Sequence, residues 1–358
     1  MKLRIFFTPS VPVALLGGLA GVLWWTVSAS PWPLDLIFLP FAAFYLLLFA
    51  ISGWALARLR AIERWETWDR PCRLLVLAPH EDDCVIAAGA IGPRNRSLGG
   101  VTRIVYLAPD ETPGLAERRT GEARAAWREA GLQDCDLVHL DLLPPLRQRN
   151  PARLRAAALA LRSIIDEFRP SVIVMPMFEG GHIHHDMVAA LIGLIVTPQD
   201  RFEVFEAPEY SPCTSLRYTP HRVIALCTRW LFGLVSYCGP PDGIDDRTIV
   251  KFRLDPRELD RKRRMLGSFV SQNAASLMAT RAYPDRFARW DRTRCRARPF
   301  PLRGSYLGFV LAARRLLPAG VVDRLFPVQL GTIGREGELT DWRKELPPDA
   351  ELGAVTRT

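Results

Sequence analysis

The strongest constraint on this chain is a series of four apolar runs, each the length of one strand. They cover residues 72–79, 101–109, 136–141 and 171–176. Near-continuous apolar runs of this length are typical of strands buried on both faces. Their alternation with helix-forming stretches predicts an α/β domain with a mostly parallel sheet. We therefore expect a Rossmann-like sheet with helices on both faces.

Two of the intervening stretches carry clear helix signals. Residues 151–168 place apolar side chains at steps of three and four, which predicts one buried stripe along a helix. Pro151 suits the first turn of that helix and Pro170 ends it. Residues 116–131 predict a second helix, which Gly131 ends.

Residues with catalytic side chains gather directly after two of the predicted strands. The first strand runs into "PHEDD" (79–83), and the fourth is followed by "MFEGGHIHHD" (177–186). The carboxyl ends of parallel strands meet at one edge of a sheet, where ligands bind. Two histidines and an aspartate at that edge, with a further carboxylate beside them, match a zinc hydrolase: three ligands, an open position for water and a base.

The composition narrows the alternatives. The net charge is +9, but no zinc-finger spacing or aromatic-basic pattern accompanies it, so nucleic acid is a weaker partner than an anionic membrane. The seven cysteines form no CxxC pair, which favours a reducing compartment. No GxSxG, P-loop or GxGxxG follows a strand, so serine-hydrolase and nucleotide-binding classes lack support.

The N-terminal residues predict a membrane anchor. Two long stretches without charge predict a transmembrane hairpin over residues 1–60, with helices at about 8–29 and 36–57. A basic juxtamembrane linker, residues 61–71, follows. Its arginines, and the lack of positive charge between the helices, place the domain in the cytoplasm. A signal peptide cleaved after Ala29 is the alternative interpretation of the first stretch, and it leaves that orientation unchanged.

The two clusters also resemble the motifs of a known family. "LLVLAPHEDDCVIAAGA" (74–90) resembles the first motif of the LmbE-like, PIG-L-type N-acetylglucosaminyl deacetylases, a strand ending in A/P-H-P-D-D-E. "EGGHIHHDMVAA" (179–190) resembles their second motif, G-H-x-x-H. Weaker similarity in "FEAPEYSP" (205–212) and "LDRKRRMLGSFVSQ" (259–272) extends the resemblance over roughly residues 72–275. It implies a zinc-dependent catalytic domain.

The resemblance implies a role for each residue that matches a motif. The zinc ligands would be His80, Asp83 and His185. Asp82 would be the general base that takes a proton from the nucleophilic water. His182 would steady the oxyanion or protonate the leaving amine.

Three further residues match the family only weakly, and two residues within the first motif differ from the family pattern. Arg119, Glu122 and Tyr210 are expected to bind substrate; a solvated ion pair on a helix and a packed aromatic are the alternatives. Glu81 stands where the family pattern has proline, and Cys84 stands where it has glutamate. We expect Cys84 to be a small buried residue and not a thiolate ligand.

These features predict a membrane-anchored, zinc-dependent amidohydrolase at the cytoplasmic face of the inner membrane. Its expected substrate is an N-acetylated amino sugar, either lipid-linked or soluble, and the membrane anchor favours the lipid-linked form. The alternatives are a sugar-binding or scaffold protein that has lost turnover, and an amidase for another acylated amine.

Three further expectations concern structure. His184 is expected to be solvated at a helix start. Residues 276–330 would form an extension, either on the membrane surface or in the core, and residues 331–358 a loose tail.

Overall fold

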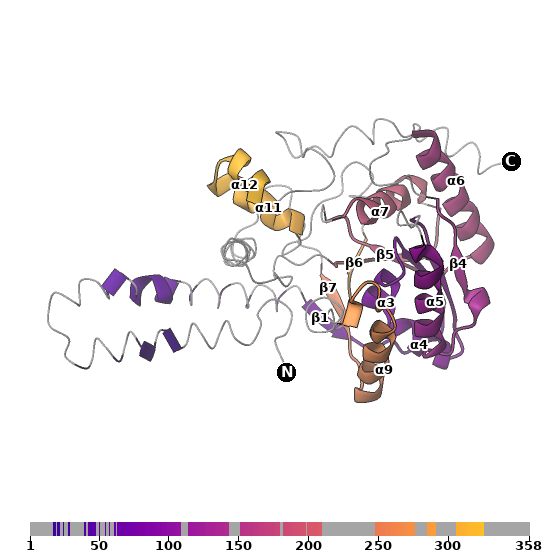
Figure 1. Ribbon diagram of the computed structural model, residues 1–358, viewed down its shortest axis with the longest axis horizontal. Coiled ribbons are helices and arrows are strands. Elements are labelled where there is room, and N and C mark those ends of the chain that lie inside the picture. The colour runs from indigo at the N-terminus through magenta and orange to yellow at the C-terminus, as the bar shows by residue number, and fades with distance from the viewer. Residues whose placement is uncertain are drawn as a thin grey trace.

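The structure is a computed structural model, and it describes eight continuous segments of the chain together with scattered positions between residues 17 and 61. The segments are residues 63–108, 114–142, 151–179, 182–197, 199–209, 248–275, 285–290 and 306–325. Figure 1 shows a central sheet with helices on both sides.

Eight strands form one sheet in the order β1-β7-β8-β6-β5-β2-β3-β4. The strands are β1 (Glu63–Glu66), β2 (Arg73–Ala78), β3 (Val101–Tyr106), β4 (Leu137–His139), β5 (Val172–Pro176), β6 (Glu203–Ala207), β7 (Ile249–Phe252) and β8 (Arg286–Arg289). β8 runs antiparallel to β6 and β7, and the other pairs are parallel. The predicted α/β fold is confirmed, but the sheet is mixed.

The order of the parallel strands determines where a ligand can bind. The chain passes from β2 to β3 and β4 on one side, then returns to β5 and β6 on the other. This is the order of a doubly wound sheet, and its switch point lies between β2 and β5, where Leu74 is paired with Val172. The loops that follow these two strands carry the two predicted clusters.

Helices cover both faces of the sheet, as predicted. They are α3 (Asp83–Ala88), α4 (Ile91–Ser97), α5 (Leu115–Arg128), α6 (Pro151–Phe168), α7 (Ile183–Ile195), α9 (Pro256–Gly267), α11 (Tyr306–Leu316) and α12 (Ala319–Leu325), with a short 3₁₀ turn at Asp134–Asp136. Alternate residues of β2 point to opposite faces. Leu75 and Leu77 pack with α6 and α7, whereas Leu74 and Val76 pack with α3, α4, α5 and α9.

Several elements differ from the sequence-based expectation. The helix predicted over residues 151–168 has those bounds as α6, and α5 ends three residues before Gly131, whose φ is 74°. β1 lies inside the predicted linker and β8 inside the predicted extension, so the sheet continues beyond residues 72–275 on both sides. Within that extension, Val310, Ala313 and Val322 are buried in the core on the α6–α7 side.

The predicted anchor lies mostly outside the described residues. Among the positions that are described, no helix is long and apolar enough to cross a membrane. The predicted tail, residues 331–358, also lies outside the described part of the chain.

A buried ion pair joins three elements next to the site. Lys262 on α9 and Asp285 beside β8 are both fully buried and in contact. Lys262 Nζ also donates to the carbonyl of Ile86, at 2.9 Å. Asp285 Oδ2 accepts from the backbone N–H groups of Ala90 and Ile91, both at 2.9 Å. The pair therefore fixes α9 and β8 against the turn between α3 and α4.

We predict that Asp285→Ala lowers the free energy of unfolding by about 3–5 kcal/mol, because it leaves Lys262 charged and buried without its partner. Asp260→Ala is the matched control, because Asp260 pairs with Arg263 on the exposed side of the same helix. The control should cost less than about 1 kcal/mol. Urea denaturation measures both values, and equal losses would contradict the buried role of the pair.

Candidate functional site

The first half of the site is the turn that leads from β2 into α3. Asp82 is the N-cap residue of α3 and Asp83 is its first residue. The backbone N–H of His80 donates to Asp83 Oδ2 at 2.9 Å, which closes the turn on itself. Asp83 is only 6% exposed, whereas Asp82 is partly exposed. The two adjacent carboxylates therefore face different surroundings, as a base and a ligand must.

The second half of the site is the start of α7, which follows β5. His182 is the N-cap residue of this helix, and its Nδ1 accepts from the backbone N–H of His184 at 3.3 Å. His185 lies one residue further along and is 2% exposed. α7 thereby directs a buried imidazole toward the β2 turn.

The structure brings the three predicted ligands together. Asp83 Oδ2 lies 3.0 Å from His80 Nδ1 and 3.1 Å from His185 Nε2. Burial alone would raise the pKa of Asp83, but the two imidazoles outweigh it and hold that pKa well below its usual range. Asp83 is therefore an ionised carboxylate between two histidines.

This donor set fits a zinc ion. Zinc accepts nitrogen and oxygen donors in tetrahedral sites with bonds of about 2.0–2.1 Å, which separates two ligand atoms by roughly 3.3 Å. The separations of 3.0 and 3.1 Å at Asp83 Oδ2 are close to that value. Three ligands also leave a fourth position open, as in catalytic zinc sites.

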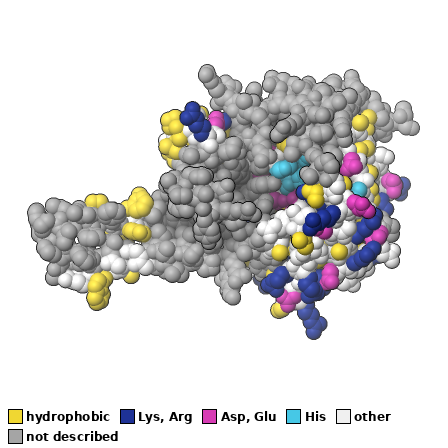
Figure 2. All heavy atoms as spheres, viewed as in Figure 1, with side chains coloured by type: hydrophobic (Ala, Val, Ile, Leu, Met, Phe, Trp, Pro, Cys, Tyr) yellow, Lys and Arg dark blue, Asp and Glu magenta, His cyan; other side chains and the backbone are white. Residues whose placement is uncertain are grey.

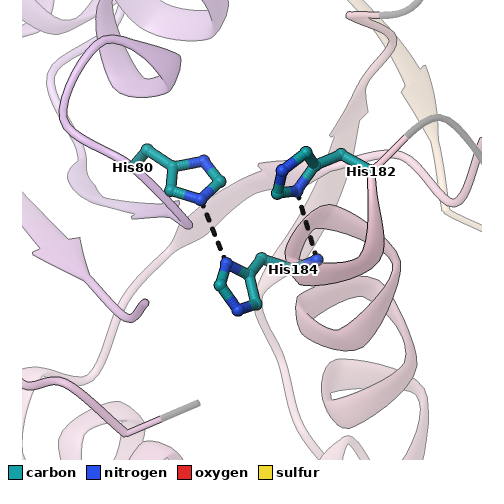
Figure 3. Close-up of side chains that lie close together, drawn as sticks. All are labelled: His80, His182 and His184. Carbon is teal, nitrogen blue, oxygen red and sulfur yellow. Dashed lines mark hydrogen bonds between the residues drawn. The ribbon is translucent and has the colours of Figure 1, made fainter. Parts of the chain in front are cut away.

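The expectation for His184 is wrong. Its side chain is 1% exposed, and its Nδ1 lies 3.0 Å from His80 Nε2 (Figure 3). The expectation relied on spacing along α7, but the β2 turn packs over this position and excludes water. His80, His182 and His184 form a second group of donors close enough to share an ion. With Asp83 engaging its other ring nitrogen, His80 is held from both sides.

His182 is a neutral hydrogen-bond donor in this arrangement. Burial, together with the charges of His185 and His80, lowers the pKa of His182 to about 3. Because Nδ1 accepts from the backbone, the ring proton lies on Nε2. This state suits stabilisation of an oxyanion better than protonation of an amine.

The other predicted residues have mixed outcomes. Asp82 Oδ1 accepts a hydrogen bond from Gln272 Nε2 at 2.8 Å. The carboxylate of Glu122 accepts hydrogen bonds from the backbone N–H and the hydroxyl of Ser271 and from Arg118 on its own helix, and not from the site histidines. Arg119 is partly buried on α5, and Tyr210 lies outside the described residues. Substrate binding by these residues stays a prediction.

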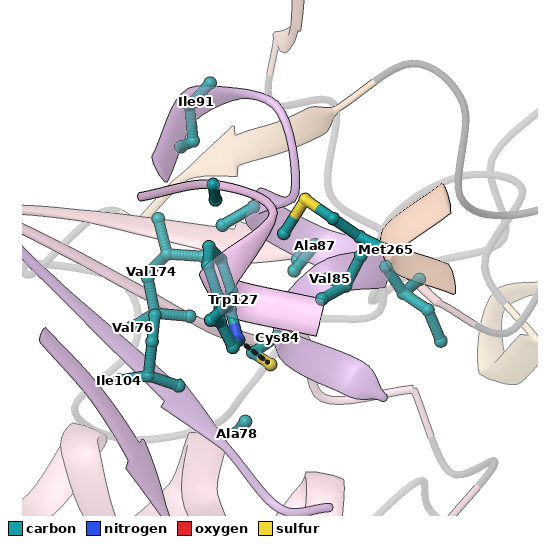
Figure 4. Close-up of a cluster of buried hydrophobic side chains, with 14 of the residues drawn as sticks. Val76, Ala78, Cys84, Val85, Ala87, Ile91, Ile104, Trp127, Val174 and Met265 are labelled. Carbon is teal, nitrogen blue, oxygen red and sulfur yellow. Dashed lines mark hydrogen bonds between the residues drawn. The ribbon is translucent and has the colours of Figure 1, made fainter. Parts of the chain in front are cut away.

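Cys84 is buried, as expected, in a pocket of hydrogen-bonding groups. Its sulfur lies 3.1 Å from the indole Nε1 of Trp127 (Figure 4). It also lies 3.2 Å from the hydroxyl of Tyr106. Burial raises the pKa of the thiol well above its ordinary value, against the opposing effect of these two partners. Cys84 is thus a neutral thiol that packs beneath the turn.

Two residues near the site were missed by the sequence analysis. Glu209 is 2% exposed, and its Oε2 lies 3.7 Å from His185 Nδ1. Gln272 contacts Asp82. Both fall in stretches with weak similarity to the family, which was the one available signal. The weak similarity identified the two stretches, but it did not show that Glu209 and Gln272 are the residues that reach the site.

A comparison with family models covers this part of the chain. Residues 75–195 match the PIG-L family, GlcNAc-PI de-N-acetylase. The match spans about a third of the chain and includes both halves of the site. It supports a hydrolytic deacetylase of the PIG-L type. No curated protein matches the chain.

Solved structures show distant similarity to this PIG-L-like chain. A deacetylase of teicoplanin biosynthesis has 17% identity and a TM-score of 0.39, over 56% of this chain and 87% of its own. The N,N'-diacetylchitobiose deacetylase of Pyrococcus horikoshii has 15% identity and a TM-score of 0.33, over 64% and 88%. A 4-carboxy-2-hydroxymuconate hydratase of Pseudomonas putida has 15% identity and a TM-score of 0.36, over 57% and 82%. At these scores none of the three decides the chemistry of this chain.

We predict that His185→Ala abolishes stoichiometric zinc binding, because it removes one of three converging ligands. Asp82→Asn is the matched control and should retain zinc, since Asp82 lies outside the donor groups found among the described residues. Elemental analysis of the purified full chain measures the metal, and circular dichroism checks that each variant is folded. Full zinc occupancy in folded His185→Ala would refute the ligand assignment.

Proposed function

We propose that this chain is a zinc-dependent hydrolase that removes an acetyl group from an N-acetylated amino sugar. One observation carries the proposal. His80, Asp83 and His185 converge at the switch point of the sheet, with Asp82 beside them, inside the segment that matches the PIG-L family. In Figure 2 histidine and acidic side chains are visible together at the surface of this face. Of the three residues, His80 is the one with a partly exposed side chain, at 20%, so a substrate can reach the group there.

The roles of the residues follow from their positions. A zinc ion held by His80, Asp83 and His185 would polarise the amide carbonyl and make a water molecule more acidic. Asp82 takes a proton from the attacking water. His182 donates its Nε2–H to the carbonyl oxygen as negative charge develops. The proton on Asp82 then passes to the leaving nitrogen, so acetate and a free amine result.

A lipid-linked substrate at the inner, cytoplasmic membrane face is part of this proposal. Its support is the two long uncharged stretches of the N-terminal sequence, together with the exposure of large apolar residues there. The described ones that are more than half exposed are Trp24, Leu39, Phe44, Leu46, Leu47 and Trp54. Exposed apolar side chains at this density are typical of surfaces that meet lipid or protein. An enzyme anchored in this way would meet a substrate embedded in the same membrane.

We predict that Asp82→Asn lowers the rate of acetate release by about 10²–10⁴-fold while zinc is retained, because it removes a positioned base. Acetate is measured with N-acetylglucosaminyl phosphatidylinositol in mixed micelles and with soluble N-acetylglucosamine. Faster release from the lipid substrate supports the lipid linkage. Undiminished activity of the variant would place the base elsewhere.

The wild-type chain also discriminates the proposal from its alternative. A sugar-binding or scaffold protein would bind zinc and release no acetate from either substrate. The neutral Cys84 in the position of the family's glutamate is the observation that favours this alternative. If the chain is such a pseudoenzyme, Cys84→Glu should restore turnover. If the chain is an active enzyme, the same substitution should disturb the pocket around Trp127 and Tyr106 and lower the stability of the fold.

The proposed orientation predicts a labelling pattern in intact cells. Ser30→Cys, between the two predicted spans, should react with a membrane-impermeant maleimide, because the positive-inside rule places this loop outside. Native Cys213 and Cys295 should react only after the membrane is opened. The reverse pattern would invert the orientation and make an exported glycan the substrate.

A further inference from the structure

A turn that follows α9, on the same side of the sheet as α3, contacts the proposed base. Gln272 Nε2 donates to Asp82 Oδ1 at 2.8 Å, although the two residues are 190 positions apart in the sequence. The side chain of Asp82 does not cap its own helix. Its carboxylate is thus oriented by a partner from outside α3.

The turn itself is fixed by its own packing. Phe269 and Ala274, on either side of Gln272, are fully buried in the core on the α3–α9 side. Asn273 has a φ of 52°, in the left-handed region that asparagine tolerates better than most residues. The backbone N–H of Ala274 returns to the carbonyl of Phe269 at 3.3 Å. The position of Gln272 is therefore set before any ligand binds.

Glu122 provides a second attachment of the same turn. Its carboxylate accepts from the backbone N–H of Ser271 at 3.0 Å and from the Ser271 hydroxyl at 2.6 Å. The Glu122 side chain is 11% exposed, so these charge-assisted bonds are shielded from water. They connect α5 to the residue next to Gln272.

The chemistry of the amide fixes its orientation. An ionised carboxylate only accepts hydrogen bonds, so the nitrogen of Gln272 must face Asp82. Gln272 Oε1 is buried and has no hydrogen-bond partner within the described part of the chain. The hydrogen bond that this side chain makes there is thus the one to Asp82.

We propose that Gln272 is a positioning residue that holds Asp82 in line for proton abstraction, and that Glu122 secures Gln272 by binding Ser271. This inference rests on the proposed function, and it gives Glu122 a different role from substrate binding. A base acts only within hydrogen-bond reach of its proton, and misplacement by about 1 Å costs about 10²-fold in rate. The contacts of Glu122 with Ser271, and of the adjacent Gln272 with Asp82, supply that placement.

The first test compares Gln272→Ala and the isosteric Gln272→Glu with the wild-type full chain. Both should lower kcat for N-acetylglucosaminyl phosphatidylinositol by about 10–100-fold, the range for groups that orient a reacting residue. KM and zinc content should change little, because neither variant removes a ligand. An unchanged kcat in folded Gln272→Glu, which places an acceptor against Asp82, would overturn the proposal.

The second test is a double-mutant cycle with Asp82→Ala. If Gln272 acts through Asp82, Gln272→Ala should have almost no further effect on kcat once Asp82 is gone. The melting temperatures of the same four proteins report the contact without any activity. Their shifts should be non-additive, since each single variant already breaks the same hydrogen bond.

The contact between Glu122 and Ser271 is tested with two further variants. Glu122→Ala should lower kcat in the wild-type background and have little effect in the Gln272→Ala background. Glu117→Ala is the matched control, because Glu117 is exposed in the first turn of the same helix and should leave kcat unchanged.

Each failure has a distinct signature. If the wild-type chain releases no acetate while the melting temperatures are non-additive, the proposed function fails and the contact remains structural. If acetate is released but the effects of Gln272→Ala and Asp82→Ala on kcat simply multiply, the proposed function stands and the positioning role is wrong. A raised KM with unchanged kcat would assign Gln272 to substrate binding instead.

Discussion

One buried carboxylate joins the two halves of the site, and the arrangement around it depends on that contact. Asp83 closes the turn after β2 by accepting from the backbone of His80, and it faces His185 from α7. An ionised carboxylate at 6% exposure without such partners would cost several kcal/mol of desolvation. The β2 turn is therefore stable in this form because α7 presents an imidazole to it, and the neighbouring strands β2 and β5 make this possible.

The sequence predicted the parts of the fold whose signal is local. β2, β3 and β5 are buried on both faces, so their apolar runs identify them without knowledge of their neighbours. α6 is marked by its stripe and by a proline at its start. β1 and β8 are four residues long and rich in charge, and what marks them as strands is their pairing, of β1 with β7 and of β8 with β6 and β7. No local pattern can predict such strands.

The same distinction applies to the candidate site. His80, Asp83 and His185 follow strands, and the rule for parallel sheets predicts their convergence. The burial of His184 depends on packing of the β2 turn over α7, which spacing along one helix does not encode. Gln272 reaches Asp82 from 190 residues away, so only the folded chain brings them together. Glu122 was predicted to bind substrate, but its contact with Ser271 depends on where the turn after α9 packs, which its own helix does not encode.

β8 has a further consequence, which concerns the order in which the chain is synthesised. It is the strand that joins β7 and β1 to β6 and the rest of the sheet, yet it follows all of them in the sequence. A nascent chain that has reached residue 252 therefore holds two separate groups of strands, each with an open edge toward the missing one. Open edges pair readily with other chains. Premature termination between β7 and β8 should for this reason yield an aggregating fragment, even though most of the site residues described here would already be present.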